Sequence, residues 1–308
     1  MKYHKIVLAG GNGYLGTVLA NYYKPLATEV ILLSRKPAAT DGNVRTIVWD
    51  AVNEGDWTAM LEGADMLINL CGKNVNCRYT EKNKAEIVRS RVVPTTLLGQ
   101  VIGKLDNPPK VWINLASSTI YRHAEDHAQD EITGEIGTGF SVEVCEQWEK
   151  AFFGINTPNT RKVVLRHAIA LGRSDGAFPR LLNLAKVGLG GKQGDGEQYV
   201  SWIHEHDTAR VTAHIFDHPE LDGVINCAAP EAIKNKDLMR IIRKAYGIPF
   251  GLPAPQWLLE IGMFIIGSET ELVLKSRWVA PTRLLQSGYM FTYSKAEHAV
   301  HDLLSLRV

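Results

Sequence analysis

The sequence lacks an excess of either charge, with 34 lysine and arginine residues against 33 aspartate and glutamate residues in 308. A chain this balanced has no general field that attracts nucleic acid or an anionic membrane surface. We therefore expect no nucleic-acid partner. Any anion that binds must be held by local groups.

Cysteine is also scarce. The four thiols, at positions 71, 77, 145 and 227, form no Cys-x-x-Cys pair and show no spacing typical of metal ligands. A chain of this length can bury a full core without disulfide bonds. The sequence therefore predicts reduced core thiols.

Long apolar runs are missing as well. The longest, residues 257–266, is interrupted by Glu260 and is far shorter than the ~20 residues of a membrane span. The first ten residues, MKYHKIVLAG, read as a strand entering a glycine loop and leave no room for a signal peptide. We therefore expect a cytoplasmic protein without membrane association.

Short β-branched runs alternate with amphipathic segments, which predicts a parallel sheet covered by helices on both faces. The expected strands are Lys5–Ala9, Val30–Ser34, Thr46–Trp49, Met66–Cys71, Val111–Ala116, Val163–Ala170 and Val224–Ala228. The expected helices are Leu15–Lys24, Tyr79–Lys104, Ser141–Phe153, His206–Phe216 and Lys236–Tyr246, the second with a kink or break at Pro94.

Beyond the sixth expected strand the pattern changes to a glycine-rich stretch, 172–206, which predicts an irregular excursion from the sheet. Prolines after Ile248 then introduce a further helix and a final segment. We predict a doubly wound α/β nucleotide-binding domain, residues 1–171 with 207–229. A small, discontinuous C-terminal substrate lobe would comprise 172–206 and 230–308.

A glycine loop follows the first expected strand and opens the first expected helix. There the first glycine permits a tight turn, the middle one lets the backbone approach a pyrophosphate, and the third lets the helix pack on the strand. The helix N-terminus adds free amides and the positive end of its dipole. The sequence predicts a Rossmann fold that binds a dinucleotide through Gly10, Gly11, Asn12, Gly13, Tyr14, Leu15 and Gly16.

The second strand lacks the terminal Asp or Glu that normally accepts from the ribose hydroxyls of NAD. Ser34 and Arg35 stand there instead, followed by Lys36. A guanidinium fork suits a 2′-phosphate, and the serine hydroxyl adds a donor. The alternative is that Arg35 and Lys36 are solvated loop charges. We predict a preference for NADP(H).

The next two strand ends offer further cofactor contacts. Asp50 is placed to accept from the adenine amino group, although an ordinary capping role fits equally well. Leu70, Cys71 and Gly72 end the fourth strand, where small residues let the cofactor ribose lie across the backbone.

Taken in order, these motifs resemble the extended short-chain dehydrogenase/reductase superfamily, and within it the NADP-dependent, sugar-nucleotide-epimerase-like epimerase family proteins. The resemblance implies a Rossmann fold, bound NADP(H) and a lobe that closes a substrate cleft. It also implies cofactor contacts from Glu86, Arg91 and Ala170, with a salt bridge between Glu86 and Arg91 as the alternative. Besides the glycine loop it rests on Ser34-Arg35-Lys36-Pro37, Asn69-Leu70-Cys71-Gly72, Ser90-Arg91-Val92, Cys145-Glu146-Gln147-Trp148-Glu149, Ser201-Trp202-Ile203-His204 and Pro281-Thr282-Arg283-Leu284-Leu285.

The superfamily's catalytic Tyr-x-x-x-Lys pair is absent. A tyrosine titrates near ~10 and is a poor base at neutral pH without a neighbouring cation. In this chain the pair maps to Phe140 and Val144 or to Ser141 and Cys145, depending on register, and neither pair transfers protons in this way.

Other residues are candidates for the lost chemistry. Ser117 resembles the superfamily serine that holds the substrate oxygen, and Tyr121 is the first candidate for an acid or base. His123, Glu143 and His167 are alternatives near the strand ends.

Three functions remain open from the sequence. One is an NADP(H)-dependent oxidoreductase or epimerase-like enzyme on a small hydroxyl or carbonyl substrate, with a sugar nucleotide suggested by analogy alone. The second is a non-catalytic NADP(H)-binding regulator, and the third is a scaffold that no longer binds the nucleotide. Extended superfamily members often dimerise through the helices equivalent to 79–104 and 141–153, so a homodimer is a candidate assembly.

Two further features have simple interpretations. In His204-Glu205-His206-Asp207 the two histidines match poorly as a ligand pair on a helix, so we expect Asp207 to cap a helix from Thr208 and expect no metal. Arg166 lies mid-strand, where a buried charge needs a partner. It predicts a structural ion pair or a contact to an anionic substrate.

Overall fold

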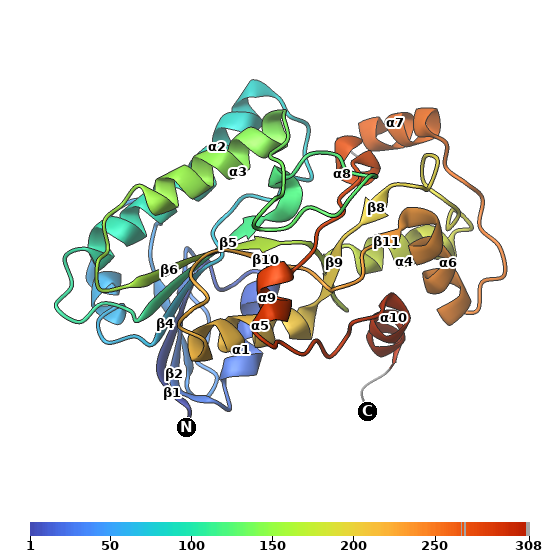
Figure 1. The fold of residues 1–308 in the computed structure, drawn as a ribbon. Coiled ribbons are helices and arrows are strands. Elements are labelled where there is room, and N and C mark those ends of the chain that lie inside the picture. The colour runs from blue at the N-terminus through green and yellow to red at the C-terminus, as the bar shows by residue number, and fades with distance from the viewer. Residues whose placement is uncertain (266, 268, 306–308) are drawn as a thin grey trace.

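The computed structural model describes residues 1–265, 267 and 269–305. At its centre lies a seven-stranded parallel sheet in the order β10-β6-β5-β4-β1-β2-β3 (Figure 1). The order reverses beside β1, which confirms the predicted doubly wound Rossmann fold. The strands are β1 (Tyr3–Ala9), β2 (Ala27–Ser34), β3 (Val44–Val48), β4 (Met66–Asn69), β5 (Val111–Ser117), β6 (Arg161–His167) and β10 (Gly223–Cys227).

The sixth strand is shorter than predicted. It ends at His167, and the following β7 (Ile169–Leu171) pairs instead with β9 (Trp202–His204) in a separate two-stranded sheet. The change of partner occurs at Ala168, because its amide donates to the Cys227 carbonyl while the next amide donates to the Ser201 carbonyl. The chain thereby leaves the main sheet for the β7–β9 pair.

Helices cover both faces of the sheet (Figure 1). One face packs against α1 (Tyr14–Tyr23) and α5 (Glu205–Asp217), the other against α2 (Glu81–Ile102) and α3 (Phe140–Phe153). Successive side chains of a strand point to opposite faces. Ile6 and Leu8 accordingly join the first core, and Val7 and Ala9 the second.

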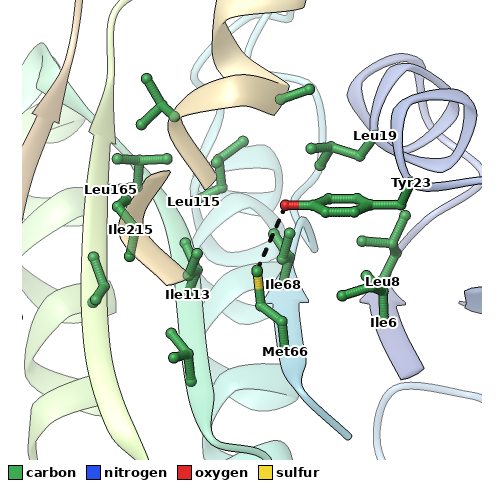
Figure 2. Packing of buried hydrophobic residues seen from close by; sticks show 14 of the residues in the cluster. Ile6, Leu8, Leu19, Tyr23, Met66, Ile68, Ile113, Leu115, Leu165 and Ile215 are labelled. Atoms are coloured by element: carbon green, nitrogen blue, oxygen red, sulfur yellow. Dashed lines mark hydrogen bonds between the residues drawn. The ribbon is translucent and has the colours of Figure 1, made fainter. Parts of the chain in front are cut away.

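Figure 2 shows the first of these cores. Leu19 and Tyr23 of α1 and Ile215 of α5 pack over strand residues that include Met66, Ile68 and Ile113. The Tyr23 hydroxyl lies 2.7 Å from the Thr212 hydroxyl and 3.8 Å from the Met66 sulfur. The phenol therefore keeps polar partners although its ring is fully buried.

The break predicted at Pro94 does not occur, since α2 runs unbroken from Glu81 to Ile102. Side chains stabilise the helix at the proline. The Thr95 hydroxyl donates to the Arg91 carbonyl at 2.7 Å, and the Trp148 indole of α3 donates to Thr95 at 2.9 Å. Packing against α3 therefore outweighs the local cost of proline.

The excursion at 172–206 is more regular than predicted. It contains α4 (Phe178–Lys186) and β8 (Tyr199–Val200) besides β9. A third apolar cluster unites α4 with two later helices. The remaining elements are β11 (Ile233–Lys234), α6 (Asn235–Ala245), α7 (Gln256–Ile265), α8 (Glu271–Leu274), α9 (Thr282–Gln286) and α10 (Ala296–Leu304).

The apolar run 257–266 lies in α7 as far as Ile265, and Ile266 is outside the described residues. No helix in the described part of the chain combines the length and hydrophobicity needed to cross a membrane.

Asp207 anchors the C-terminal segment and does not cap the helix, contrary to the expectation. The helix α5 begins at Glu205, and the Nδ1 atom of its N-cap His204 accepts from the His206 amide. The fully buried Asp207 carboxylate accepts from the amides of Thr292 at 3.0 Å and Tyr293 at 2.8 Å. Those bonds fix the chain between α9 and α10 against the start of α5.

Arg166 forms the structural ion pair that its position predicts. Its guanidinium donates two bonds of 2.8 Å to the Glu149 carboxylate of α3, and both residues are buried. The ring of Tyr121 lies 4.9 Å from the same guanidinium. The charge at this strand is therefore neutralised inside the protein.

We expect Glu149→Ala to lower the free energy of unfolding by about 3 kcal/mol, because it leaves a buried guanidinium without its carboxylate. Urea unfolding measures this. The double variant Glu149→Leu with Arg166→Met should recover most of the loss, since it removes both charges. A single variant as stable as the wild type would show that the pair contributes nothing to stability.

Candidate nucleotide-binding site

The glycine loop connects β1 to α1 at the carboxyl edge of the sheet. Gly10 has a φ of +76°, and a Cβ there would lie 3.2 Å from the Cys71 amide nitrogen. A Cβ on Gly16 would lie 2.1 Å from the Gly11 carbonyl oxygen. The turn and the close contact of helix with strand therefore both require glycine, as the motif predicts.

Gly13 is different, because its surroundings are open. A Cβ there would meet nothing nearer than the Gly10 carbonyl oxygen at 3.8 Å. Gly13 is the N-cap of α1, which has no side-chain cap and no acidic residue in its first turn. The positive end of the helix thus faces outward where a phosphate can approach.

Two loop side chains make contacts of their own. Asn12 donates to the Lys36 carbonyl at 3.4 Å, which ties the loop to the turn after β2. The Tyr14 hydroxyl donates a short hydrogen bond to the buried Glu205 carboxylate of α5. Burial and this carboxylate raise the pKa of Tyr14 well above its usual range, so the phenol stays protonated.

The Tyr14 hydroxyl also lies against Gly172, the residue that follows β7. A Cβ on Gly172 would overlap the Tyr14 hydroxyl oxygen at 1.4 Å, so only glycine fits there. Ala170 lies two residues earlier in β7, half-buried, with its carbonyl accepting from the Ala177 amide. Leu15 of the loop packs against the core beneath α1.

The turn after β2 presents Arg35 to solvent. Ser34 is buried and its hydroxyl oxygen accepts from the Lys36 amide at 3.2 Å. Among the described residues, no carboxylate lies within ion-pair distance of the exposed Arg35 guanidinium. An uncompensated cation therefore stands at the position that the sequence predicts to contact a 2′-phosphate.

Asp50 is engaged in its own turn. One carboxylate oxygen accepts from the amides of Val52 and Asn53, both at 2.8 Å, and the other from the Asn53 side chain at 2.6 Å. These bonds lower the pKa of Asp50. The capping alternative thus accounts for its contacts, and its adenine contact stays a prediction.

The end of β4 lies against the glycine loop. The Leu70 amide donates to the Ala9 carbonyl at 2.8 Å, and the Cys71 amide to the Asn69 side chain at 3.1 Å. Burial raises the pKa of Cys71 to about 12, so this thiol stays protonated. Gly72 is exposed beside Arg91, whose Cζ would lie 3.1 Å from a Cβ at that position.

Glu86 and Arg91 do not pair with each other. Glu86 is exposed and binds the Lys73 ammonium, which lowers the pKa of its carboxyl. Arg91 is half-buried, donates to the carbonyls of Ile87 and Lys73 at 3.0 and 3.1 Å, and lies over the Trp148 ring. Within the described part of the chain it has no carboxylate partner, so it too is a cation available to an anion.

The two catalytic candidates lie at the end of β5 and in the turn that follows it. Ser117 is half-buried and its hydroxyl oxygen accepts from the Thr119 amide at 3.2 Å. Tyr121 is only 2 % exposed, and its hydroxyl donates to Asn226 at 3.0 Å. Burial raises the pKa of Tyr121, which is the wrong direction for a base at neutral pH. This geometry favours a structural role for Tyr121.

The alternative candidates differ in exposure. His167 is buried between the Ala168 carbonyl at 2.6 Å and the Thr208 hydroxyl at 2.9 Å. Burial lowers the pKa of His167 to about 4, so it is neutral at physiological pH. Glu143 and His123 are exposed. His123 lines a cleft of about 800 Å³ beside the C-terminal lobe.

His204, His206 and Asp302 place their ligand-type atoms within 4.8 Å of one another. Sequence reasoning missed Asp302 because it comes from the distant α10. The His204 Nδ1 accepts an amide proton, so in the neutral ring Nε2 carries the hydrogen and faces Asp302 at 3.3 Å. A metal-ligating histidine normally uses its second nitrogen as a donor, so this geometry favours a His–Asp pair.

Two basic residues near β5 also escaped the sequence analysis. The Lys275 ammonium donates to the Thr119 carbonyl at 2.9 Å, and Arg277 donates to the Thr119 hydroxyl at 3.2 Å. Both come from the stretch after α8, far from Thr119 in sequence. No local pattern indicated this contact.

The fold and the glycine loop together define a dinucleotide-binding α/β protein of the Rossmann class. Residues 6–228 match the NAD dependent epimerase/dehydratase family, and the chain belongs to that family. Residues 254–303 match a domain of unknown function, DUF1731. The family resemblance drawn from the motifs is thereby confirmed.

Relatives align along nearly the whole chain. The epimerase family protein YfhF of Bacillus subtilis is 30% identical over 98% of each chain. The human epimerase family protein SDR39U1, crystallised with NADPH, superposes with a TM-score of 0.86 at 29% identity, covering 97% of this chain and 98% of the other. A nucleoside-diphosphate sugar epimerase from Corynebacterium glutamicum superposes with a TM-score of 0.76 at 27% identity, covering 98% and 58%.

Gly13→Ala should weaken NADPH binding by roughly tenfold or more while leaving stability nearly unchanged, because the new methyl enters open space that a phosphate would occupy. Gly16→Ala should lower the free energy of unfolding by about 1–3 kcal/mol, since its methyl meets the backbone of Gly11. Fluorescence titration and urea unfolding of both variants separate the two effects. Unchanged NADPH affinity of Gly13→Ala would contradict the phosphate position.

His167 predicts a loss of stability in acid. Its folded pKa of about 4 lies below the value of 6.5 in an unfolded chain, so the unfolded state binds the proton first as the pH falls. This contribution is complete above pH 6.5 and is lost towards pH 4. His167→Gln should reduce the difference in unfolding free energy between neutral and acidic solution by about 3 kcal/mol. The exposed His298→Gln is the control, and equal pH dependence of both variants would refute the assignment.

Proposed function

We propose that the protein binds NADP(H) at the carboxyl edge of the sheet and uses it in oxidoreductase or epimerase-like chemistry on a small hydroxyl- or carbonyl-bearing substrate. The observation that carries the proposal is the glycine loop. Gly10 and Gly16 are sterically required, while Gly13 opens the uncapped start of α1 to a ligand. The human relative crystallised with NADPH supports the choice of cofactor.

The proposed contacts follow the edge of the sheet. Residues 10–16 would hold the pyrophosphate, and Ser34 with Arg35 the 2′-phosphate. Asp50 would approach the adenine, and residues 70–72 and Ala170 the ribose and nicotinamide portions. Glu86 and Arg91 of α2 would complete the cradle. Arg91 suits this role because it is a half-buried cation whose described hydrogen bonds go to carbonyl groups.

When bound, the nicotinamide supplies or accepts a hydride. The chain's own residues position the substrate beside it. Ser117 ends β5 at the same edge and has a hydroxyl hydrogen to offer a substrate oxygen. Tyr121 would support this turn through Asn226 and Arg166 rather than move a proton.

A non-catalytic NADP(H)-binding regulator is the second candidate. It is favoured by one observation, the lack of a Tyr-x-x-x-Lys pair in α3, where Phe140 and Val144 or Ser141 and Cys145 stand instead, depending on register. Burial raises the pKa of Cys145 to about 12, so this thiol is no substitute base. Consumption of NADPH with any carbonyl substrate would decide for the enzyme.

We also propose where the substrate binds. With a nucleotide-binding domain of residues 1–171 and 207–229 and a substrate lobe of residues 172–206 and 230–308, the substrate would lie between the two. The groove between α2 and α3, lined by Val88, Val92 and Phe140 among others, is the face through which a homodimer would form.

A cytoplasmic location fits a protein that draws on the NADP(H) pool. Sugar nucleotides are the first substrates to test, given the epimerase relative.

Arg35→Ala should weaken NADPH binding by roughly tenfold to a hundredfold and leave NADH binding unchanged, because it removes charge-assisted hydrogen bonds worth about 1.5–3 kcal/mol to the 2′-phosphate. Fluorescence titration with both nucleotides measures the ratio. Lys36→Ala is the matched control for general loss of positive charge. Equal affinity of the wild type for NADPH and NADH would remove the role proposed for Arg35.

A further inference from the structure

The helix α3 lacks the lysine of the Tyr-x-x-x-Lys pair, yet a lysine from another element lies beside the candidate site. Lys275 follows α8, and its side chain is 8% exposed. Its ammonium donates to the Thr119 carbonyl at 2.9 Å, in the 3₁₀ turn Ser118–Ile120 that follows Ser117. The lysine therefore reaches the edge of the sheet where the candidate site lies.

Glu271 connects this lysine to α3. One of its carboxylate oxygens lies 4.0 Å from the Lys275 ammonium, and the other accepts from the Ser141 hydroxyl at 3.2 Å. Ser141 is one of the positions to which the lost tyrosine maps. In that register the lysine of the pair maps to Cys145, and Lys275 is one of the charged groups near its thiol. Lys275 therefore supplies a positive charge near α3, although the helix itself has no lysine at the expected position.

The backbone around Lys275 is fixed. The hydroxyl of Ser276, the next residue, donates to the Ala124 carbonyl at 2.6 Å, and the Ser276 carbonyl accepts from the Ala124 amide at 3.2 Å. Arg277 is 7 % exposed and donates to the Thr119 hydroxyl. These bonds hold the segment against the turn after β5, so the position of the lysine is set by the fold.

A cleft of about 800 Å³ opens at this point. Lys275 and Glu271 line it together with Gly137, Thr138 and His123. A substrate in this cleft would meet the Lys275 ammonium, which is hydrogen-bonded to the turn after β5. The cleft is therefore the place where a carbonyl oxygen and a proton donor could meet.

We propose that Lys275 is the proton-transfer residue of the site and replaces the missing Tyr-x-x-x-Lys pair. The inference rests on the proposed function. As the carbonyl carbon of a substrate accepts a hydride from the reduced nicotinamide, the carbonyl oxygen takes a proton from Lys275. The C–H and O–H bonds form, the nicotinamide is oxidised, and the neutral amine regains a proton from water. In the oxidative direction the amine accepts the proton.

The charges around Lys275 suit this role. Arg277 repels the ammonium and burial destabilises it, while Glu271 and Cys145 act in the opposite direction. The net effect lowers the pKa of Lys275, which brings a lysine closer to the range useful for acid–base catalysis. Arg122, His123 and Glu260 are the other charged or titratable residues that line the cleft.

The test measures the titration of Lys275 directly. Reductive methylation with [¹³C]formaldehyde gives each lysine an NMR signal, and the signal absent from Lys275→Arg identifies the residue. We expect it to titrate below the ~10.4 of an unperturbed lysine. Arg277→Gln should move it to higher pH and Glu271→Gln to lower pH. A Lys275 signal that titrates as an unperturbed lysine and does not respond to either variant would overturn the proposal.

Turnover supplies the second readout, with 9,10-phenanthrenequinone as the probe carbonyl and NADPH as reductant. Lys275→Ala should bind NADPH as the wild type does, lose turnover, and regain it when methylamine is added. Lys236→Ala, which removes a lysine paired with Glu197, is the control with unchanged rate. Wild-type rates in Lys275→Ala, or a wild type that binds NADPH but does not reduce the quinone, would overturn the assignment. Failure to bind NADPH would instead refute the proposed function.

Discussion

The close contact between the start of α1 and the loop before it determines where every other part of the site lies. A side chain at Gly16 would collide with the Gly11 backbone, so the helix sits as near to β1 as two backbones allow. This places Tyr14 where its hydroxyl reaches Glu205 of α5. Glu205 belongs to the helix whose Asp207 fastens the chain before α10. The glycine contact is therefore linked through α5 to the position of the chain before α10.

Arginines that support the fold and arginines at the candidate site differ in whether a carboxylate pairs with them. The buried Arg166 is neutralised by two hydrogen bonds to Glu149, and such a pair has nothing left to offer a ligand. Arg35 and Arg91 lie near the glycine loop and, among the described residues, have no carboxylate partner. A chain with almost no net charge thus concentrates uncompensated cations at the edge where a phosphate-bearing cofactor is proposed to bind.

The sheet and the glycine loop were predictable from the sequence because both depend on local pattern. Buried strands appear as β-branched runs, and a phosphate loop needs glycine at fixed spacing. The helix α4 was missed because glycines surround it, and the end of β6 because an apolar run continues through Ala168 while its hydrogen-bond partner changes. Asp207 was misassigned since its partners, Thr292 and Tyr293, are some 85 residues away in the chain.

The prediction of catalytic residues from the sequence is limited in the same way, because it too depends on local patterns. The absence of a Tyr-x-x-x-Lys pair is visible in the sequence, because that pair belongs to one helix. A replacement from another element is not, since Lys275 and Thr119 are brought together only when the segment after α8 packs on the turn after β5. Acid–base catalysis requires a group of suitable pKa at the right place, whichever element supplies it. The loss of a motif from α3 is therefore evidence about α3 alone, and the function of the cleft depends on what the second lobe brings to it.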